Sequence, residues 1–371
     1  MEKYKDVYVT GVGIISKFGN TIEGYWTELN KDRISHMQSI SINNQQTVIS
    51  ADIVSAIKYE SNYIEYFLEI CCEAILNAIK DAEIHLNRQK GCVIVGTGMG
   101  IEDAFLSRQD QPHDFMSQLE AKIIKRLKVR IKVITIANAC CAGVQSIAYA
   151  FDMLNIGEYD FVIAGGVEAF SYITYCGFKR LNSIDETGCK PFDKNRKGIY
   201  VGDGAVFFAL SSHKPKHSYC KLLSQAVTND GYHVVSPEPD GIQISRAIRQ
   251  TLTRANVAST EIDVVVAHGT GTKLNDCIEA KVLYEIFGEI NVIAPKGKIG
   301  HTGGASGAFG LLTAICTLKY QCLPHIVNLK EFDETMKINP VMFKKKNQSI
   351  KNVIVDCFAF GGTNAVLLCG L

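Results

Sequence analysis

Five short runs of apolar, mostly β-branched residues lead into clusters of glycine, and they constrain the fold more than any other feature of the sequence. Continuous apolar runs of this length are typical of strands buried on both faces, in a sheet that helices cover. Between them, apolar residues recur at the i, i+3, i+4 spacing of a helix with one packed face. The predicted strands lie in 7–13, 92–100, 161–169, 264–272 and 353–364. The predicted helices include 66–82, 144–155 and 306–319.

The same order of elements occurs in two parts of the chain. A helix ending in AIKDAEI precedes the strand GCVIVGTGMG, and later a helix ending in TLTRANV precedes IDVVVAHGTGT. A glycine-bearing helix start follows in each part (NACCAGVQSI and GHTGGASGAFG), and each part closes on a strand (GIYVGDGAVFFAL and AFGGTNAVLL). This echo predicts an α/β protein made of two copies of one unit. With the join near 210–220, the predicted domains are 1–215 and 216–371.

Composition and charge exclude several classes of function. The 371 residues are 47% hydrophobic and 21% charged, with a formal net charge of +1, so neither nucleic acid nor a membrane surface is expected as the main partner. The start of the chain lacks a signal-peptide pattern and no run of 18 apolar residues occurs, which predicts a cytoplasmic protein. The 13 cysteines are scattered, without a CxxC pair or a Cys/His cluster at zinc spacing, so no metal site is expected.

The N-terminal GVG, Gly11–Gly13, is a partial match to a dinucleotide-binding motif. It lacks the third glycine of GxGxxG, and a partial match of this kind is weak. We therefore interpret it as a tight turn after a strand.

Cys140 lies in KVITIANACCAGVQSIAYAFDML, where a β run ends at Ile136 and a helical pattern begins. A cysteine at a helix start meets unpaired backbone N–H groups and the positive end of the helix dipole, which favour a thiolate with a lowered pKa. The same N–H groups could stabilise the oxyanion of a tetrahedral intermediate. On this evidence alone, Cys140 and Cys141 could equally be small core residues.

Two histidines favour the catalytic interpretation. His268 directly follows a buried-strand pattern in AHGTGT, and His301 directly precedes a helix in KIGHTGGASG. Glycines around a histidine let backbone and substrate approach closely, which suits a donor aimed at a carbonyl or carboxylate. Either residue alone could be a core histidine, but both lie at edges of the repeated unit that correspond to the position of Cys140.

These residues and the segments around them resemble the β-ketoacyl synthases, the condensing enzymes of fatty-acid and polyketide synthesis. The resemblance covers essentially the whole chain, and the segments together are highly specific. They are VYVTGVGIISKFGNTIEGYW, NACCAG, FVIAGGVEA, KPFDKNRKGIYVGDGA, DGYHVVSPEPDG, AHGTGTKLNDCIEA, PKGKIGHTGGASGA and FAFGGTNA. It implies a thiolase-like fold, in which two duplicated α/β halves form an α-β-α-β-α layered sandwich.

The resemblance also implies roles for individual residues. Cys140 would carry the acyl chain as a thioester, while His268 and His301 would support decarboxylation of a malonyl extender and stabilise the enolate. Lys296 matches the family lysine and Glu279 its carboxylate partner, although an ordinary ion pair would give the same pattern. The remaining matches are the supporting Asp276 and a group for the gate, the oxyanion hole and substrate binding, namely Phe360, Gly361, Thr270 and Thr272.

The implied reaction needs no metal or organic cofactor, because its substrates arrive on the phosphopantetheine of an acyl carrier protein. The implied partners are that carrier protein and a second subunit, as a homodimer or as a heterodimer with a homologous ketosynthase-like chain. The basic stretch 120–132 could dock an acidic carrier, or it could be a solvated helix face.

The chain departs from the family pattern beside the nucleophile and before it. Cys141 and Ala142 replace the usual small and hydroxyl residues, and Ile131-Lys132 replaces the usual Gly-Pro. The stretch between Gly100 and Cys140 is short for the family, in a region that helps to form the dimer interface and the acyl pocket. These departures favour a specialised pathway over housekeeping fatty-acid synthesis.

Two other interpretations remain open from the sequence. A thiolase would have a second catalytic cysteine near a C-terminal glycine-rich loop, a role that Cys357 fits poorly. A non-catalytic, chain-length-setting partner subunit would typically lack the nucleophile, whereas Cys140, His268 and His301 are all present.

Overall fold

The computed structural model describes residues 5–32, 37–42, 45–54, 62–86, 89–100, 115–128 and 130–371. Residues 101–114, part of the stretch that is short for the family, lie outside this set. The strands are β1 (Val7–Ile15), β2 (Met37–Ile42), β3 (Gln45–Asp52), β4 (Gly91–Thr97), β5 (Lys132–Ala137), β6 (Phe161–Glu168), β7 (Val201–Gly202), β8 (Gly204–Ser211), β9 (Cys220–Asn229), β10 (Val264–Val266), β11 (Asn291–Ile293), β12 (Asn339–Pro340), β13 (Asn352–Phe358) and β14 (Thr363–Gly370). The helices are α1 (Ile22–Leu29), α3 (Tyr63–Asp81), α4 (Phe115–Leu127), α5 (Ala142–Asn155), α6 (Tyr172–Arg180), α7 (Ile242–Ala255), α8 (Lys273–Phe287), α9 (Lys296–Ile299) and α10 (Ser306–Tyr320), with short 3₁₀ turns at Ala139–Cys141, Ser259–Glu261 and Gly303–Ala305.

Eleven strands form one hydrogen-bonded sheet in the order β12-β11-β10-β13-β14-β9-β1-β8-β6-β4-β5. Read outward from the central β9–β1 pair, the order β1-β8-β6-β4-β5 matches β9-β14-β13-β10-β11. In each half, parallel strands lie at the outside and antiparallel strands at the centre. The predicted duplication of one α/β unit is therefore present, with the two copies joined through β1 and β9.

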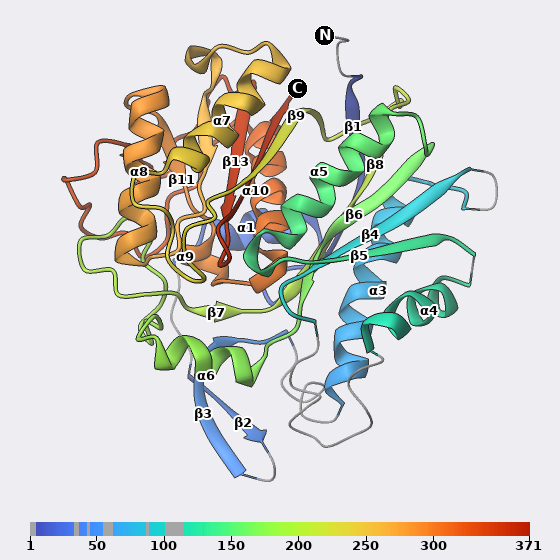
Figure 1. The fold of residues 1–371 in the computed structure, drawn as a ribbon, viewed down its shortest axis with the longest axis horizontal. Coiled ribbons are helices and arrows are strands. Elements are labelled where there is room, and N and C mark those ends of the chain that lie inside the picture. The colour runs from blue at the N-terminus through green and yellow to red at the C-terminus, as the bar shows by residue number, and fades with distance from the viewer. Residues whose placement is uncertain are drawn as a thin grey trace.

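The helices form three layers around the two halves of the sheet. Three apolar clusters define them: α3 and α4 cover one outer face, α5 and α10 lie between the halves, and α7 and α8 cover the other outer face. Figure 1 shows α3 and α4 on one side of the molecule, α7 and α8 on the other, and α5 and α10 between them. This is the expected α-β-α-β-α sandwich of a thiolase-like fold.

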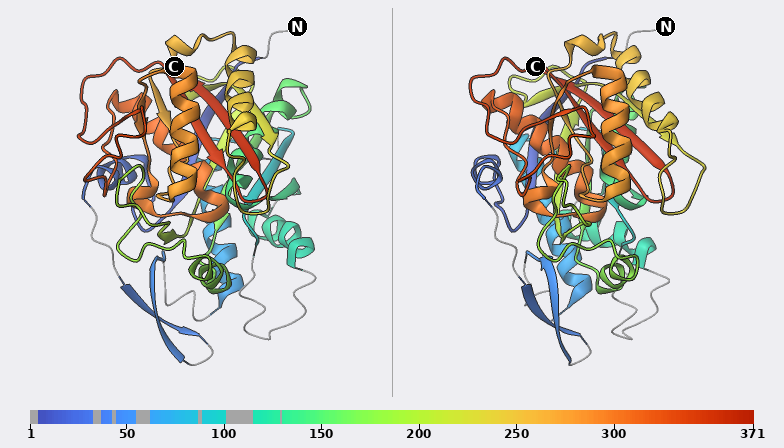
Figure 2. Two further views of the ribbon diagram at one scale, coloured as in Figure 1. Left: turned by 60° about the vertical axis from the view of Figure 1, so that its left-hand side comes forward. Right: turned by 90° about the vertical axis from the view of Figure 1, so that its left-hand side faces the viewer.

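A separate three-stranded sheet has the order β2-β3-β7. Its β2–β3 hairpin projects from the end of the molecule opposite the C-terminus (Figure 2). Through β7, which precedes β8, this small sheet is connected to the body of the fold.

The interpretation of Gly11–Gly13 as a turn is wrong, because both glycines lie inside β1. A Cβ on Gly13 would lie 1.8 Å from the carbonyl oxygen of Ala74, and one on Gly11 would lie 2.4 Å from that of Ala78. Both carbonyls belong to α3, so the missing side chains let this helix pack directly on β1. The two glycines therefore serve helix–sheet packing.

Candidate active site

The nucleophile candidate lies on a turn between β5 and α5. Ala139 has a positive φ of 42°, and the 3₁₀ turn Ala139–Cys141 runs directly into α5. Two hydrogen bonds hold this turn to the end of β4: the Asn138 N–H donates to the Thr97 carbonyl at 3.3 Å and the Ala139 N–H to the Gly98 carbonyl at 3.2 Å. The expected position of Cys140 at the start of a helix is confirmed.

The electrostatics of Cys140 differ from the expectation of a lowered pKa. Burial raises the pKa of the thiol to about 12, and the charges of Cys357 and Glu168 act in the same direction. The positive charge of Lys296 and the backbone N–H of Phe360 lower the pKa and only partly oppose this. Because Cys140 is 8% exposed, desolvation of the thiolate outweighs the helix terminus. The resting nucleophile is therefore a thiol.

His268 and His301 come together in the fold, with ring centroids 6.0 Å apart and ring planes at 89°. Each ring has its Nδ1 occupied. Lys296 Nζ lies 3.2 Å from Nδ1 of His268, and the Gly303 N–H donates to Nδ1 of His301 at 3.1 Å. When Nδ1 accepts a hydrogen bond, the proton of a neutral imidazole is on Nε2. Both rings thus present an Nε2–H donor.

Both histidines are neutral at physiological pH. Burial and the nearby charge of Lys296 lower the pKa of His301 to about 3. The same causes, together with His301, hold the pKa of His268 well below its usual value. Neutral rings with the proton on Nε2 can donate a hydrogen bond to a carbonyl or enolate oxygen beside the thiol.

Glu279 positions His268 through the backbone and not through an ion pair with Lys296. Its two carboxylate oxygens accept the N–H groups of His268 at 2.7 Å and of Gly269 at 2.8 Å. Lys296 instead bonds to the backbone oxygen of His268 at 2.5 Å. Burial raises the pKa of Glu279 to about 7.

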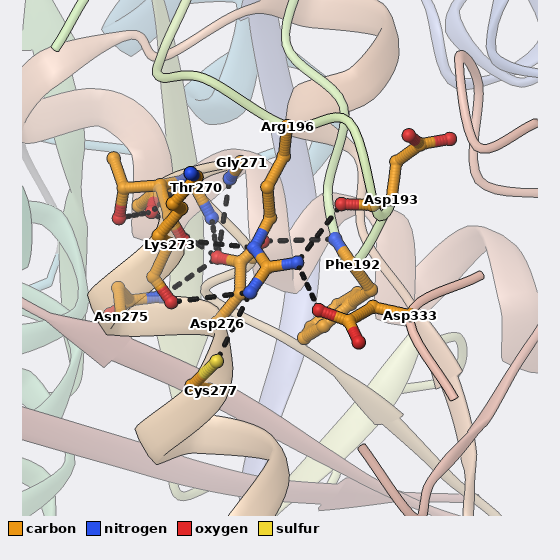
Figure 3. A network of polar contacts seen from close by, with 12 residues as sticks. Phe192, Asp193, Arg196, Thr270, Gly271, Lys273, Asn275, Asp276, Cys277 and Asp333 are labelled. Atoms are coloured by element: carbon orange, nitrogen blue, oxygen red, sulfur yellow. Dashed lines mark hydrogen bonds and ion pairs between the residues drawn. The ribbon is translucent and has the colours of Figure 1, made fainter. Parts of the chain in front are cut away.

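Asp276 holds the loop that contains the two threonines. Its carboxylate accepts the N–H groups of Phe192, Thr270 and Gly271 at 2.9, 3.0 and 3.2 Å, and Arg196 lies 3.8 Å away. Figure 3 shows these bonds converging on the carboxylate, with Arg196 extending past it toward Asp333. The hydroxyl oxygens of Thr270 and Thr272 lie 2.9 Å apart. Asp276 therefore supports the site by fixing the loop that contains Thr270 and Thr272.

Two cavities meet at Cys140. One, of about 350 Å³, extends along α6 and has a mostly apolar lining that includes Phe170, Ile173, Gly177, Phe178 and Glu168. The other, of about 270 Å³, is lined by His268, Thr270, Thr272, Leu274, Asn275 and Asp230 among others. Cys140, His301 and Phe360 line both. The reacting groups thus lie where an apolar cavity joins a more polar one.

Phe360 lies at this junction. Its ring is 5.5 Å from that of Phe178, and its side chain is 37% exposed. Gly361 follows with a φ of 82°, and its N–H donates to the Val234 carbonyl at 2.7 Å. A partly exposed ring between two cavities is in the right place for a gate, and the backbone N–H of Phe360 also lowers the pKa of Cys140.

Sequence reasoning missed three residues near the site. Glu168 and Phe178 line the apolar cavity, and Asp356 is buried beside Glu279 and Cys357. The one available signal was a charged residue inside an otherwise apolar run, which marks both Glu168 and Asp356. Cys357, the residue a thiolase would need, is fully buried and is absent from the described lining of either cavity.

Within the described ranges, no helix is long and apolar enough to cross a membrane. The same residues bring together no group of three or more His, Cys, Asp or Glu side chains that could hold a metal ion.

Comparison with known proteins extends these observations to the whole chain. The profile of the β-ketoacyl synthase N-terminal domain matches residues 4–215, and that of the C-terminal domain matches residues 219–330. The 3-oxoacyl-[acyl-carrier-protein] synthase 2 of Coxiella burnetii is 25% identical, over 99% of both chains.

Solved structures show the same architecture. The ishigamide ketosynthase/chain length factor superposes with a TM-score of 0.87 at 26% identity, over 99% of both chains. One chain of the complex between the ketosynthase ApeO and its chain length factor ApeC from Xenorhabdus doucetiae superposes with a TM-score of 0.84 at 23% identity, over 99% of this chain and 98% of that one, which is a likeness of fold. With both halves of the chain matched and the condensing geometry in place, this protein belongs to the β-ketoacyl synthase family and is a condensing enzyme.

Proposed function

We propose that the protein catalyses a decarboxylative Claisen condensation between an acyl group held on Cys140 and a malonyl group on an acyl carrier protein. The product would be a β-ketoacyl-acyl carrier protein. One observation carries this proposal. Cys140, His268 and His301 line the same cavity, and both neutral histidine rings present an Nε2–H donor.

Loading begins with a thiol, because the pKa of Cys140 is raised. As sulfur attacks the acyl thioester carbonyl, a new S–C bond forms and the thiol proton is transferred toward the phosphopantetheine sulfur, because Nε2 of both rings already carries a proton. The oxyanion of the tetrahedral intermediate accepts the backbone N–H groups of Cys140 and Phe360. Collapse breaks the bond to the phosphopantetheine sulfur, which leaves with the proton.

In the second half-reaction the malonyl carboxylate leaves as CO₂ and its bonding electrons form an enolate. The Nε2–H groups of His268 and His301 stabilise the enolate oxygen, and the carbon attacks the thioester on Cys140. The C–S bond breaks and the Cys140 sulfur takes up a proton from solvent, which replaces the one that left with phosphopantetheine. No step requires a metal or organic cofactor, since loss of CO₂ supplies the carbanion.

The cavities suggest where each substrate part binds. The apolar cavity along α6 suits an acyl chain, while the cavity with Thr270 and Thr272 offers hydroxyl groups to phosphopantetheine. Lys122, Lys125 and Arg126 on α4 provide positive charge for an acidic carrier, although Arg126 also pairs with Glu65 at 2.9 Å. The relative from Coxiella burnetii is named for a carrier-bound product, which supports this partner.

A second subunit is proposed as well, either another copy or a homologous ketosynthase-like chain. Strand β5 is the last strand of the eleven-stranded sheet, and no other strand among the described residues pairs with its outer edge, where a second subunit could add one. The ishigamide ketosynthase is described with a chain length factor, which favours a heterodimer and a specialised pathway. The alternative role as a non-catalytic partner is disfavoured because Cys140, His268 and His301 are all present and line one cavity.

The test is acylation of Cys140. The protein, alone and with a co-expressed homologous subunit, is incubated with acyl-carrier thioesters, and mass spectrometry locates the adduct. We expect an acyl group on Cys140 and product after malonyl-carrier addition. Cys140→Ala should abolish both, and an undiminished condensation rate in this variant would disprove the mechanism.

A further inference from the structure

Glu168, the last residue of β6, binds two segments that are distant in the sequence. Its Oε2 accepts the N–H of Gly98 at 2.7 Å and the N–H of Gly304 at 2.6 Å. Its Oε1 accepts the hydroxyl of Thr97 at 3.1 Å. Thr97 ends β4 in the first half of the fold and Gly98 follows it, whereas Gly304 belongs to the second half.

The space around this carboxylate is closed by glycines. A Cβ on Gly98 would lie 2.3 Å from Oε2, and one on Gly303 would lie 2.5 Å from it. Side chains at these positions would displace the carboxylate, since Cβ contacts this short do not occur. The glycines therefore let one side chain reach backbone N–H groups on both sides.

Each segment bound by Glu168 carries a reacting group. On one side, the carbonyls of Thr97 and Gly98 accept the N–H groups of Asn138 and Ala139, which immediately precede Cys140. On the other side, Gly303, the neighbour of Gly304, donates its N–H to Nδ1 of His301. The Glu168 carboxylate is thus connected to the Cys140 turn through two hydrogen bonds, one to the Gly98 N–H and one from the Ala139 N–H to the Gly98 carbonyl. It is connected to His301 in a similar way, through the N–H groups of Gly304 and Gly303.

We propose that Glu168 is a positioning residue that fixes the Cys140 turn and the His301 loop relative to each other. The inference rests on the proposed function, in which the enolate stabilised by His301 must attack the acyl thioester on Cys140. A displacement of about 1 Å between reacting groups can cost 100-fold in rate, so a clamp of this kind has a measurable effect.

Hydrogen bonding and charge at Glu168 can be separated by substitution. Glu168→Gln keeps an oxygen for the N–H groups of Gly98 and Gly304, and its amide can donate to the Thr97 hydroxyl. Glu168→Ala removes every acceptor and leaves the two N–H groups unpaired. Asp263→Ala is a matched control, because Asp263 Oδ2 likewise accepts two N–H groups, of Lys351 at 2.7 Å and Asn352 at 2.9 Å, at the start of β10, away from the site.

Hydrogen–deuterium exchange tests the clamp without any substrate. In Glu168→Ala we expect faster exchange in peptides that cover 138–141 and 303–306, with near wild-type exchange in Glu168→Gln and in Asp263→Ala. Wild-type exchange of both peptides in Glu168→Ala would overturn the proposal. Because no acyl group is needed, this result stands even if the protein fails to accept acyl-carrier thioesters, an outcome that would contradict only the proposed function.

Rates give the second test. Acyl loading of Cys140 and malonyl decarboxylation should each fall about 100-fold in Glu168→Ala, and Glu168→Gln should restore both to within about 10-fold of wild type. Equal impairment in the two variants would overturn the proposal, because it would point to proton transfer by the carboxyl group itself.

A pH profile gives a third readout that a purely structural role would not change. The negative charge of Glu168 opposes ionisation of Cys140, so alkylation of Cys140 by iodoacetamide should shift to lower pH in Glu168→Gln. The exposed Cys176 and Cys277 serve as internal references in the same mass spectra. Here the charge reports proximity: an unshifted Cys140 profile would show that Glu168 does not lie as close to the nucleophile as the clamp requires, and it would overturn the proposal.

Discussion

Lys296 donates to the backbone oxygen of His268 at 2.5 Å and lies 3.2 Å from Nδ1 of the same residue. One amino group therefore fixes the position of the strand end and the tautomer of the ring. The remaining ring proton is on Nε2, directed away from Lys296, which is where an enolate oxygen would need a donor.

Replacing Lys296 by Met should remove the hydrogen bond to Nδ1 that keeps the proton of His268 on Nε2. We expect malonyl decarboxylation to fall by about 100-fold or more, the effect of losing one oriented donor, while acyl loading falls less. The measurement is CO₂ release compared with acylation of Cys140. Lys298→Met is the control, because Lys298 is also a buried residue of α9 but donates to the carbonyls of Lys31 and Asp32. Equal losses in both half-reactions would contradict the assigned role.

The lowered pKa values of the histidines predict how stability depends on pH. The pKa of His301 is about 3 in the folded protein and near 6.5 in the unfolded chain, which therefore binds protons more readily as pH falls. The contribution of neutral His301 to the free energy of unfolding is fully present above pH 6.5 and is lost as the pH falls from 6.5 to about 3. The free energy of unfolding should thus fall on acidification, with a slope from His301 of up to about 1.4 kcal/mol per pH unit.

Chemical denaturation at a series of pH values between 7 and 4 measures this slope. His301→Asn should flatten it, whereas replacing the exposed His213 should leave it unchanged. A wild-type slope in His301→Asn would show that His301 is not the residue that resists protonation.

The sequence pattern predicted those parts of the fold that depend on local periodicity. The predicted helix 144–155 lies within α5, and the predicted strand 161–169 is β6 extended by one residue. The strand predicted over 264–272 is only Val264–Val266, because the glycines after it form the loop that Asp276 holds. Where backbone groups bond to a distant carboxylate instead of a neighbouring strand, periodicity carries no information.

The chemistry of the site was predictable by residue type but not by environment. Cys140, His268 and His301 follow recognisable strand and helix signals, and the fold brings them to one cavity. The raised pKa of Cys140 depends on burial by both halves of the chain, which no local pattern encodes. The same holds for Glu168, whose partner Gly304 lies 136 residues away.

Asp356 predicts a second pH effect, of opposite sign. Its two carboxylate oxygens are buried without a hydrogen-bond partner, and burial together with the charges of Glu279 and Cys357 raises its pKa well above the usual value. The folded protein therefore holds this proton while the unfolded chain releases it above about pH 4, so stability falls as pH rises from 4 toward the folded-state pKa. Asp356→Asn removes this loss.

We expect Asp356→Asn to match wild type in urea denaturation at pH 4, where both side chains are neutral. At pH 8 the variant should be more stable, because its amide needs no proton. A variant less stable than wild type at pH 8 would mean that the ionised carboxylate has a favourable partner in the folded protein.

Gly177 offers a way to change the length of the acyl chain without disturbing the fold. It lies within α6 and lines the apolar cavity, and a Cβ built on it would have no atom within 4 Å. Because Gly177 lines the cavity that we assign to the acyl chain, we expect Gly177→Val to narrow that cavity, and losing a helical glycine should offset much of the cost of a β-branched residue. With a series of acyl-carrier substrates, we expect loading of long chains on Cys140 to fall while short chains load at the wild-type rate.

Gly177→Ala, which adds only the Cβ, is the matched control and should leave the chain-length profile nearly unchanged. If Gly177→Val loads all chain lengths as wild type does, the acyl chain does not run along α6, and the assignment of the two cavities would have to be reversed.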